Sequence, residues 1–365
     1  MGLGVPSVNI AFIEQSITAI QRGERGIIAM ILTDAGMDDK SSFTVFDVSD
    51  IPEGLSEVNK QQLKFALMGY QTAPRKIIGY CMKTSAGYTD ALKWAATQKF
   101  NYLVATTAET DEKTQDIVSW IKSQRTNNHM TYKAVLSNTA ADCEAIVNLT
   151  SGATMGDTAY TAEQLCSRVA GIICGTPLTM SCTYAPLTEM SDCDRLTETE
   201  LSAAVNRGEL KFMWDGEKVK LCRGVNSFVT TADGKGESYQ KIKIMDAMDM
   251  ITDDIRLTAQ DSYIGKYANS YDNKCLLVTA INGYFNTLIS DKVLGSGSCK
   301  INVEAQRNFF VSQGGKLVID GETVNVEDCS DDDIKRGNTK SKVFLRADIS
   351  ILDAIEDIEL PIYIG

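Results

Sequence analysis

The side chains that most often carry enzyme chemistry are scarce in this chain, which contains a single histidine. His129 stands in the polar stretch "TNNHMTY". A catalytic histidine needs a nucleophile and an orienting group within hydrogen-bond reach, and a zinc site needs several Cys or His ligands at set spacings. Nothing around His129 in the sequence meets either requirement. We therefore predict a solvated loop histidine, no catalytic residue and no metal ligand.

Two lysines have neighbours that partly fit a phosphate-binding loop, whose pattern is G-x-x-x-x-G-K-[ST]. In "MKTS", methionine replaces the glycine before Lys83, and in "DGKGES", glycine follows Lys235 where Ser or Thr is needed. After the first apolar run, "LTDAGMDD" supplies one glycine, too few for the dinucleotide fingerprint G-x-G-x-x-G. We expect these segments to be loops, and we expect no bound cofactor.

An acidic cluster lies near the end of the chain, in "CSDDDIKRG". Asp331, Asp332 and Asp333 are adjacent, whereas a calcium-binding EF-hand needs ligands at alternate positions and a glycine at the sixth. The simpler interpretation is that Ser330 caps a short helix and that the acids stabilise its N-terminus. Paired carboxylates for hydrolysis stay an open alternative, but no specific pair is indicated.

Composition narrows the classes of partner. The chain has 365 residues, is 44% apolar and 23% charged, and carries a net charge of −12, from 36 basic and 48 acidic residues. Such a charge disfavours binding to nucleic acid or to an anionic membrane. No run approaches the 18 apolar residues of a membrane-spanning helix. We therefore expect no nucleic-acid partner and no membrane anchoring.

The ten cysteines run from Cys81 to Cys329 and include no C-x-x-C pair. The first ten residues lack the basic start of a secretory signal, so we expect no export to an oxidising compartment. We interpret the cysteines as reduced thiols that are buried as small apolar side chains.

The elements between residues 27 and 149 alternate in type. We expect strands at residues 26–34, 42–48, 76–82, 101–107 and 132–136, and helices at residues 56–70, 89–100 and 111–124, the first of them capped by Ser56. Strands that alternate with helices of this length indicate βαβ units and a largely parallel sheet with helices on its faces. The fold class is therefore α/β in this region and α+β over the whole chain.

Further elements follow this region. The capping-box spacing of Thr161 and Gln164 predicts a helix that ends at Gly175. In "LKFMWDGEKVKLCR", Asp215-Gly216 predicts a hairpin with a type I′ turn. Two long amphipathic helices follow. The apolar stripe of the first is Ile244, Met248, Ile251 and Ile255, with Asp246, Asp249 and Asp253 placed elsewhere; that of the second is Leu277, Ile281, Tyr284 and Leu288.

Both ends of the chain have strand-like patterns. We expect strands in "CKINVEA", "KLVIDGETV", "SKVFLRADISIL" and "ELPIYI", and the alternation in "LRADISI" predicts a half-buried strand. The apolar end positions are Val8, Ile10 and Phe12 at the N-terminus and Leu360, Ile362, Tyr363 and Ile364 at the C-terminus. The pattern alone favours edge strands paired within the same molecule.

Several stretches, in order along nearly the whole chain, resemble the contractile-tail sheath proteins of myophages and phage-tail-like bacteriocins. They are "PSVNIAF", "TAIQRGERGIIAMIL", "YTAEQLCSRVAGIICGTPLTMSCTY", "CRGVNSFVTT", "KGESYQKIKIMDAMDMITDDI", "YIGKYANSYDNKCLLVTAINGYF" and "DAIEDIELPIYI". The most specific parts are Val225-Asn226-Ser227 and "YIGKYAN". Because no catalytic device is visible, the resemblance favours a structural subunit over an enzyme.

The resemblance implies hexameric rings that stack as a helical sheath around a tail tube. The terminal arms of each subunit would complete a sheet in neighbouring subunits. The implied parts are an N-terminal arm (1–26), an outer α/β domain (27–235), a core domain of long helices and a mixed sheet (236–352) and a C-terminal arm (353–365). Asp331, Asp332, Asp333 and Lys335 are candidates for contact with the tube.

The implied function is contraction that drives the tube through a target cell envelope. The partners would be the same protein, the tube protein, and baseplate and terminator or collar proteins. The particle would be a virion tail or a bacteriocin, assembled in the cytoplasm of the host bacterium. The alternative is a cytosolic α/β enzyme with a divergent nucleotide-binding loop.

Overall fold

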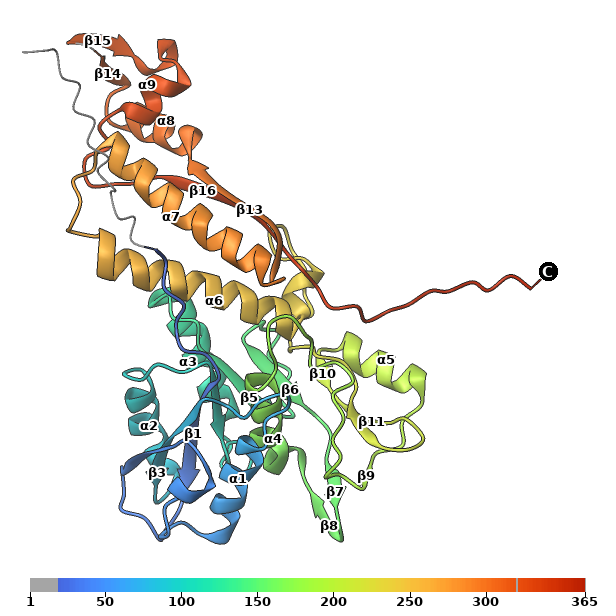
Figure 1. Cartoon of the computed structure of the whole chain (residues 1–365). Coiled ribbons are helices and arrows are strands. Elements are labelled where there is room, and N and C mark those ends of the chain that lie inside the picture. Colours follow the sequence, from blue (N-terminus) through green and yellow to red (C-terminus); the bar gives the residue numbers. More distant parts are fainter. Residues whose placement is uncertain (1–18, 320, 365) are drawn as a thin grey trace, which may run out of the picture. The chain divides into compact units, whose positions relative to one another are not determined.

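A computed structural model of the chain describes residues 19–319 and 321–364. These residues form two compact units (Figure 1). The larger, which we call the α/β unit, contains Arg22–Asp254 together with residues 351–364. The smaller unit contains residues 19–21 and Ile255–Ser350. The α/β unit thus holds the C-terminal segment as well as the expected βαβ region.

The α/β unit is built on a sheet with strand order β10-β6-β5-β4-β1-β3-β2. The strands are β1 (Ile27–Thr33), β2 (Ser42–Val45), β3 (Lys76–Met82), β4 (Tyr102–Ala105), β5 (Lys133–Ser137), β6 (Ile146–Leu149) and β10 (Glu209–Leu210). All neighbours pair in parallel except β2, which is antiparallel to β3. The prediction of a largely parallel sheet is confirmed.

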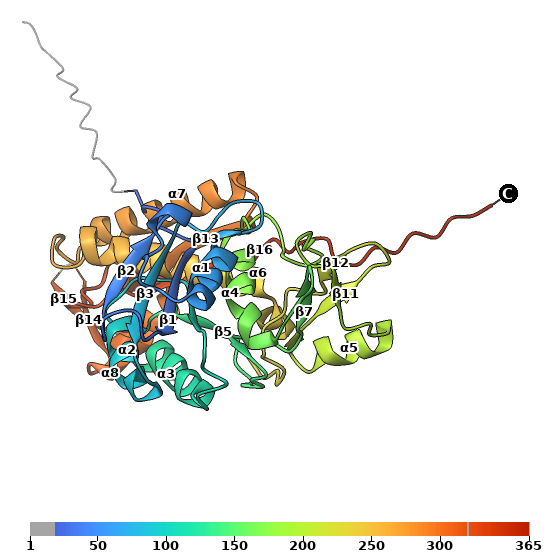
Figure 2. The same cartoon turned by 90° about the horizontal axis from the view of Figure 1, so that it is seen from below.

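Helices cover both faces of this sheet (Figures 1 and 2). The helices α1 (Glu57–Leu67) and α4 (Ala162–Cys174) lie on one face, and α2 (Tyr88–Ala95) and α3 (Thr114–Asn127) on the other. Alternate side chains of β1 serve the two faces: Ile28, Met30 and Leu32 pack with α1 and α4, whereas Ile27, Ala29 and Ile31 pack with α2 and α3. This alternation follows from the period of a strand and explains why β1 is apolar throughout.

Local signals placed the helix ends correctly. The Ser56 side chain accepts a hydrogen bond from the backbone N–H of Asn59. Thr161 and Gln164 form the expected capping box, and Gly175 is the C-cap of α4. Within α4, a Cβ added at Gly171 would lie 2.2 Å from the carbonyl oxygen of Ala66. Glycine at this position therefore permits the close contact of α4 with α1.

A smaller region of the α/β unit was only partly predicted. The expected hairpin is β11 (Phe212–Trp214) paired with β12 (Val219–Leu221). The type I′ turn was wrong, because only Gly216 has positive φ and four residues separate the strands, with Asp215 accepting hydrogen bonds from the N–H groups of Glu217 and Lys218. Not predicted were α5 (Glu198–Asn206) and a three-stranded sheet of β7 (Ala153–Met155), β8 (Thr158–Tyr160) and β9 (Asp192–Cys193).

The first long helix, α6 (Ile242–Thr258), buries acids that the sequence analysis placed on another face. Asp246 and Asp249 are 9% and 6% exposed. Lys133 Nζ lies 3.3 Å from Asp246 and 2.6 Å from Asp249, and Arg125 donates to both carboxylate oxygens of Asp249. Helix α6 therefore buries two faces. One is the apolar stripe that contains Ile251, and the other is an acidic face whose carboxylates are paired with cations on β5 and α3.

The smaller unit contains the second long helix, α7 (Tyr271–Ser290), which packs along β13 (Leu294–Ile301). Strand β13 shares a two-stranded sheet with β16 (Leu345–Ile351). Between them lie α8 (Val303–Ser312), the antiparallel pair β14 (Lys316–Ile319) and β15 (Glu322–Asn325), and α9 (Asp331–Arg336). The expected strand "CKINVEA" ends early, because Asn302 caps α8.

Short turns complete the set. The 3₁₀ turns are η1 (Val48–Asp50), η2 (Ser85–Gly87), η3 (Glu237–Gln240) and η5 (Val326–Asp328), and η4 (Ala259–Tyr263) is a π-helical turn after α6.

Candidate assembly surfaces

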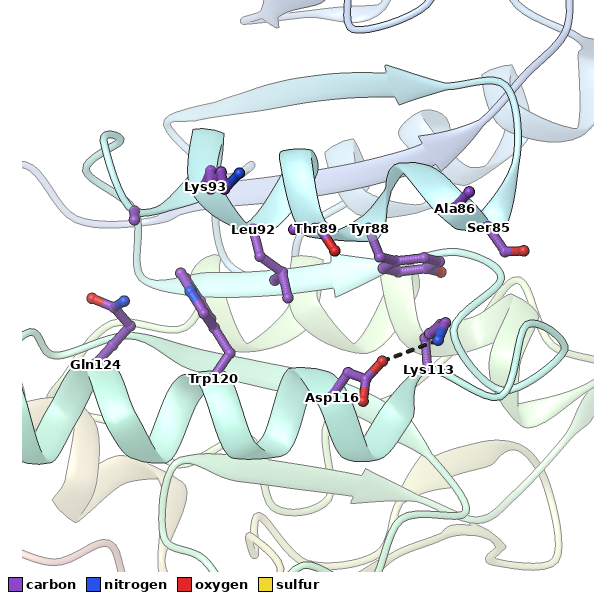
Figure 3. A pocket seen from close by; sticks show the side chains of 11 residues that line it. Ser85, Ala86, Tyr88, Thr89, Leu92, Lys93, Lys113, Asp116, Trp120 and Gln124 are labelled. Carbon is purple, nitrogen blue, oxygen red and sulfur yellow. Dashed lines mark hydrogen bonds and ion pairs between the residues drawn. The ribbon is translucent and has the colours of Figure 1, made fainter.

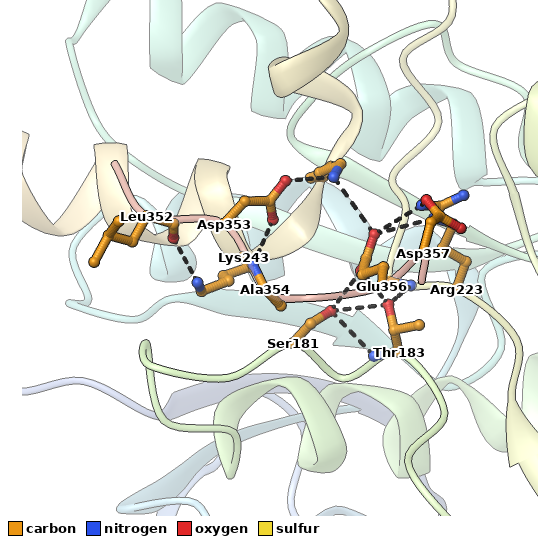
Figure 4. Close-up of polar contacts among 11 residues, drawn as sticks. Ser181, Thr183, Arg223, Lys243, Leu352, Asp353, Ala354, Glu356 and Asp357 are labelled. Carbon is orange, nitrogen blue, oxygen red and sulfur yellow. Dashed lines mark hydrogen bonds and ion pairs between the residues drawn. The ribbon is translucent and has the colours of Figure 1, made fainter. Parts of the chain in front are cut away.

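The carboxylate of Glu356 makes the most contacts between the segment after β16 and the rest of the α/β unit (Figure 4). Thr183 Oγ1 and Ser181 Oγ donate to Glu356 Oε1 at 2.6 and 3.1 Å. Arg223 Nε donates to Oε2 at 3.1 Å, and Lys241 Nζ lies 3.4 Å from the same oxygen. Only 7% of the Glu356 side chain is exposed. The site therefore provides both hydroxyl donors and cations to a buried carboxylate.

Neighbouring residues strengthen this attachment. Lys243 Nζ donates to the carbonyl oxygen of Leu352, Lys241 donates to Asp353, and Arg223 Nη2 donates to Asp357 at 2.7 Å. We call residues 352–357 the root of the C-terminal arm.

Burial by itself would raise the pKa of Glu356. The hydrogen bond from Thr183 and the charges of Lys241 and Arg223 outweigh this effect and hold the pKa below its usual value. The carboxylate is therefore ionised at neutral pH and attracts both cations.

Residues 358–364, which we call the tip, differ from the root. Ile358, Leu360, Ile362, Tyr363 and Ile364 are between 74% and 96% exposed. Within the described part of the chain, no hydrogen bond or ion pair involves the tip. In the single chain "ELPIYI" does not form a strand within its own molecule, because no ladder partner lies among the described residues, and a strand paired with another copy stays a prediction. A run of exposed apolar side chains is typical of an unoccupied interaction segment.

The β13–β16 sheet in the smaller unit could accept a further strand, which is the kind of partner that the tip lacks. It contains two strands among the residues that the structure describes. On the apolar side of β16, Ile349 is 39% exposed, Ala347 is exposed, and Leu345 and Ile351 are half-buried. The expected half-burial of this strand is thus only partly met. Two-stranded sheets are marginal alone, and their free edges accept further strands.

Two other predicted surfaces have different outcomes. Val8, Ile10 and Phe12 lie outside the described residues.

The structure brings Asp331, Asp332, Asp333 and Lys335 together on α9, where Ser330 and Asp333 form a capping box. Asp332 pairs with Lys335 at 2.9 Å, and Asp331 pairs with Arg307 at 3.0 Å. The predicted short capped helix is confirmed, whereas a contact with the tube stays a prediction.

The carboxylate of Asp34, which directly follows β1, binds Ser56, the N-cap residue of α1. Asp34 Oδ2 accepts from the N–H and hydroxyl of Ser56 at 2.9 and 2.7 Å and from Asn59 Nδ2 at 2.8 Å. Burial would raise the pKa of Asp34, but these hydrogen bonds and one from the Gly36 N–H hold it low. Nucleotide-binding sheets often place a phosphate at such a helix N-terminus. Here the N-cap residue Ser56 donates to the protein's own Asp34 instead, and the Ser56 hydroxyl accepts from the backbone N–H of Asn59.

The other candidates for chemistry are ordinary surface groups. Lys83 follows β3 in a loop, and Lys235 lies in a turn and pairs with Glu144 at 2.8 Å. His129 is exposed in the loop after α3. The described ranges contain no cluster of His, Cys, Asp and Glu suited to a metal ion. Nor does any described helix combine the length and apolar character needed to cross a bilayer.

All ten cysteines lie in the described ranges, and each is a free thiol. Most are buried, as expected. Burial raises the pKa of the Cys81 thiol to about 11, so very little reactive thiolate forms at neutral pH.

A groove of about 640 Å³ runs between α2 and α3, the two helices on one face of the sheet (Figure 3). The side chains of Leu92 and Trp120 point into it from opposite helices. Its ion pair, Lys113 with Asp116 at 3.1 Å, is a helix-surface pair. None of the residues singled out in the sequence lines this groove, and we assign no chemistry to it.

Comparison with known proteins identifies the family. The profile of the phage tail sheath protein central domain matches residues 83–227, and that of the phage tail sheath C-terminal domain matches residues 234–365. A tail sheath protein of Clostridium phage phiCD119 is 34% identical over 363 residues, which cover 98% of each chain. This chain belongs to the phage tail sheath protein family. It is therefore a structural component of a tail and not an enzyme, as the resemblance implied.

Solved structures support the fold of this sheath protein. The sheath tail protein of Desulfitobacterium hafniense matches with a TM-score of 0.69 at 17% identity, over 95% of this chain and 100% of the other. The anti-feeding prophage helical sheath in its contracted state matches with a TM-score of 0.69 at 12% identity, over 99% of both chains. The mixed α/β architecture is thus that of sheath proteins.

The partners of Glu356 were missed in the sequence. They come from segments far apart in the chain: Thr183 and Glu356 are 173 positions apart. One available signal was the acidic stretch "DAIED" directly before an apolar tail.

Proposed function

We propose that this sheath protein polymerises as stacked hexameric rings around a tail tube and contracts to drive the tube through a target cell envelope. The observation that carries the proposal is that one chain contains both a segment without a strand partner and a sheet with an edge that could accept a strand. Among the residues that the structure describes, the tip is apolar and has no partner, and the β13–β16 sheet has only two strands. Each copy therefore has a segment to donate and a surface to receive one.

The proposed contact is addition of the tip to the β13–β16 edge of another copy, by β-augmentation. Backbone hydrogen bonds would form the ladder, and Ile349 and its neighbours would meet the side chains of the tip. Such a contact joins different surfaces of two copies and does not close on itself, so it extends into a helical array. The N-terminal positions Val8, Ile10 and Phe12 are proposed to act in the same way on another neighbour.

The strength of one link is moderate. Each ladder hydrogen bond contributes about 0.5–1.5 kcal/mol net, and burial of Ile362 or Ile364 contributes about 1.5–3 kcal/mol. Ordering of the tip and loss of subunit freedom offset much of this. Because every subunit both gives and receives an arm, many such links together hold a sheath.

The proposed contraction needs no nucleotide, because the energy is stored when the extended sheath assembles around its tube.

The proposed partners are further copies, a tail tube protein, and baseplate and terminator or collar proteins. The acidic helix α9, with Asp331, Asp332, Asp333 and Lys335, is the proposed tube contact. We assign the outer domain to residues 27–235, the core domain to residues 236–352 and the arms to both ends. The assembled product is a virion tail or a bacteriocin particle, formed in the cytoplasm of the host bacterium.

Photocrosslinking tests the proposed contact. Tyr363 is replaced by the photoreactive amino acid benzoylphenylalanine, and assembled protein is irradiated. A mixture of isotopically light and heavy subunits distinguishes links between copies from links within one copy. The proposal expects links between copies to peptides from β13 or β16. The same replacement at Phe46, which is 60% exposed on the α/β unit, is the control and should not label these strands. Links that stay within one chain, or that avoid both strands, would contradict the proposal.

A further inference from the structure

The motifs that carry the sheath resemblance meet at the root of the C-terminal arm. Arg223 comes from "CRGVNSFVTT", Lys241 and Lys243 from "KGESYQKIKIMD", and Glu356 from "DAIEDIELPIYI". The loop "TMSCTY" adds the hydroxyls of its serine and threonine. We call this set the clasp: Ser181, Thr183, Arg223, Lys241 and Lys243, with Leu352, Asp353, Glu356 and Asp357 (Figure 4).

The chemistry of the clasp suits a fixed attachment. A buried carboxylate is unfavourable unless hydrogen bonds and opposite charges replace its hydration. Glu356 receives hydroxyl donors on Oε1 and the cations Arg223 and Lys241 on Oε2, so neither oxygen lacks a partner. The guanidinium of Arg223 also bridges Glu356 and Asp357, so two consecutive residues of the root are held by one planar group. Release of the root would leave Arg223 and Lys241 without these partners.

The clasp ends where the apolar tip begins. The last clasp contact is at Asp357; Ile355 inside the clasp is also exposed, but from Ile358 onward the described apolar side chains are exposed without any further polar contact to hold the segment. An extended tip of residues 358–364 reaches roughly 23 Å, at about 3.3 Å per residue. A fixed origin confines the tip to a limited volume and reduces the entropy that is lost when it pairs.

We infer that the clasp is a positioning device that fixes the origin and direction of the arm, so that the tip is presented to a second copy of the chain. This inference rests on the proposed function of the arm. The root belongs to the α/β unit although it follows directly on β16 of the smaller unit. The donated strand is therefore carried by one unit, and the edge proposed to receive it is carried by the other.

The clasp is opened in the full chain by Arg223→Gln and, separately, by Glu356→Gln. Asp90→Asn, which removes a carboxylate from the exposed pair with Lys40, is the matched control. The protease Glu-C, which cleaves after glutamate, reports on the root. In the wild type it should cut after Glu359 in the tip and spare Glu356, whereas Arg223→Gln should permit cleavage at Glu356. Mass spectrometry of the shortened chain identifies the site.

Assembly is measured as the critical concentration for tube formation, by sedimentation and electron microscopy, with thermal unfolding of the unassembled subunit as the check on folding. Both clasp variants should raise the critical concentration about tenfold or more, as expected when a tether loses its geometry. The melting temperature should stay within a few degrees of the wild-type value, and the control should match the wild type in both measurements. Arg223→Lys keeps the charge and should recover part of the loss.

Two results would overturn the inference. One is an unchanged critical concentration in Arg223→Gln although Glu-C reaches Glu356. The other is a rise in the critical concentration that is accompanied by a large fall in the melting temperature of the unassembled subunit, because poor folding would then explain the assembly defect. A chain without residues 359–365 separates this failure from that of the proposed function. If the truncated chain forms normal tubes, the proposal of a donated arm is wrong. If the truncated chain fails to assemble but the clasp variants form normal tubes, the donated arm is retained and the clasp is not needed.

Discussion

Lys133 Nζ lies 2.6 Å from Asp249 Oδ2, and only 3% and 8% of the two side chains are exposed. This buried pair joins strand β5 of the sheet to the long helix α6. Burial alone would raise the pKa of Asp249, but the charges of Lys133 and Arg125 hold it below the usual value. Helix α6 is therefore attached to the α/β unit by charge as well as by its apolar stripe.

Removal of one partner from this pair should be costly. Asp249→Asn leaves Lys133 and Arg125 buried without their shared carboxylate, which should lower the free energy of unfolding by about 3 kcal/mol. Urea unfolding of the unassembled subunit measures this. The control Asp90→Asn should cost less than about 1 kcal/mol, because its pair is exposed. Equal effects of the two substitutions would show that the pair does not hold α6.

Acid should destabilise the subunit through carboxylates whose folded-state pKa values are low. Asp34 has a folded pKa below its ordinary value of 3.8, so its stabilising contribution is present above that value and is lost as the pH falls through the folded pKa. Unfolding in urea from about pH 6 to about pH 2.5 should show stability falling at the acid end. The decline should be shallower in Asp34→Asn. The same slope in both proteins would contradict the role given to Asp34.

The apolar face of α6 should not tolerate a charge. Ile251 is 7% exposed, so Ile251→Asp places a carboxylate without a partner in the core. We expect insoluble protein or misfolded monomers, assessed from the soluble fraction and circular dichroism. Ile251→Val, the matched control, should cost only about 0.5–1.5 kcal/mol and still assemble. A soluble Ile251→Asp variant that forms tubes would mean that this face of α6 is not a core.

Sheath assembly should be indifferent to reductant. All ten thiols are free, and burial raises the pKa of several of them. Tubes incubated with and without dithiothreitol should look the same by electron microscopy and sediment alike. Dissolution by the reductant would reveal a disulfide between copies.

Local and periodic features were predictable from the sequence, because their causes lie close together in the chain. The parallel sheet, the Ser56 cap, the capping box at Thr161 and the capped helix α9 are of this kind. The burial of Asp246 and Asp249 was not predictable, since the cation that pairs with Asp249 on β5 is 116 residues away. The expected strand in the tip depended on a partner that one sequence does not identify.

The decisive measurement removes residues 359–365 and compares folding with assembly. Circular dichroism should show that the α/β unit is still folded, because its sheet and the Glu356 attachment do not involve these residues. Electron microscopy should show few or no tubes at concentrations where the full chain assembles. Normal tubes from the truncated chain would contradict the donated arm, and a wholly unfolded truncated chain would show that the segment completes its own subunit instead.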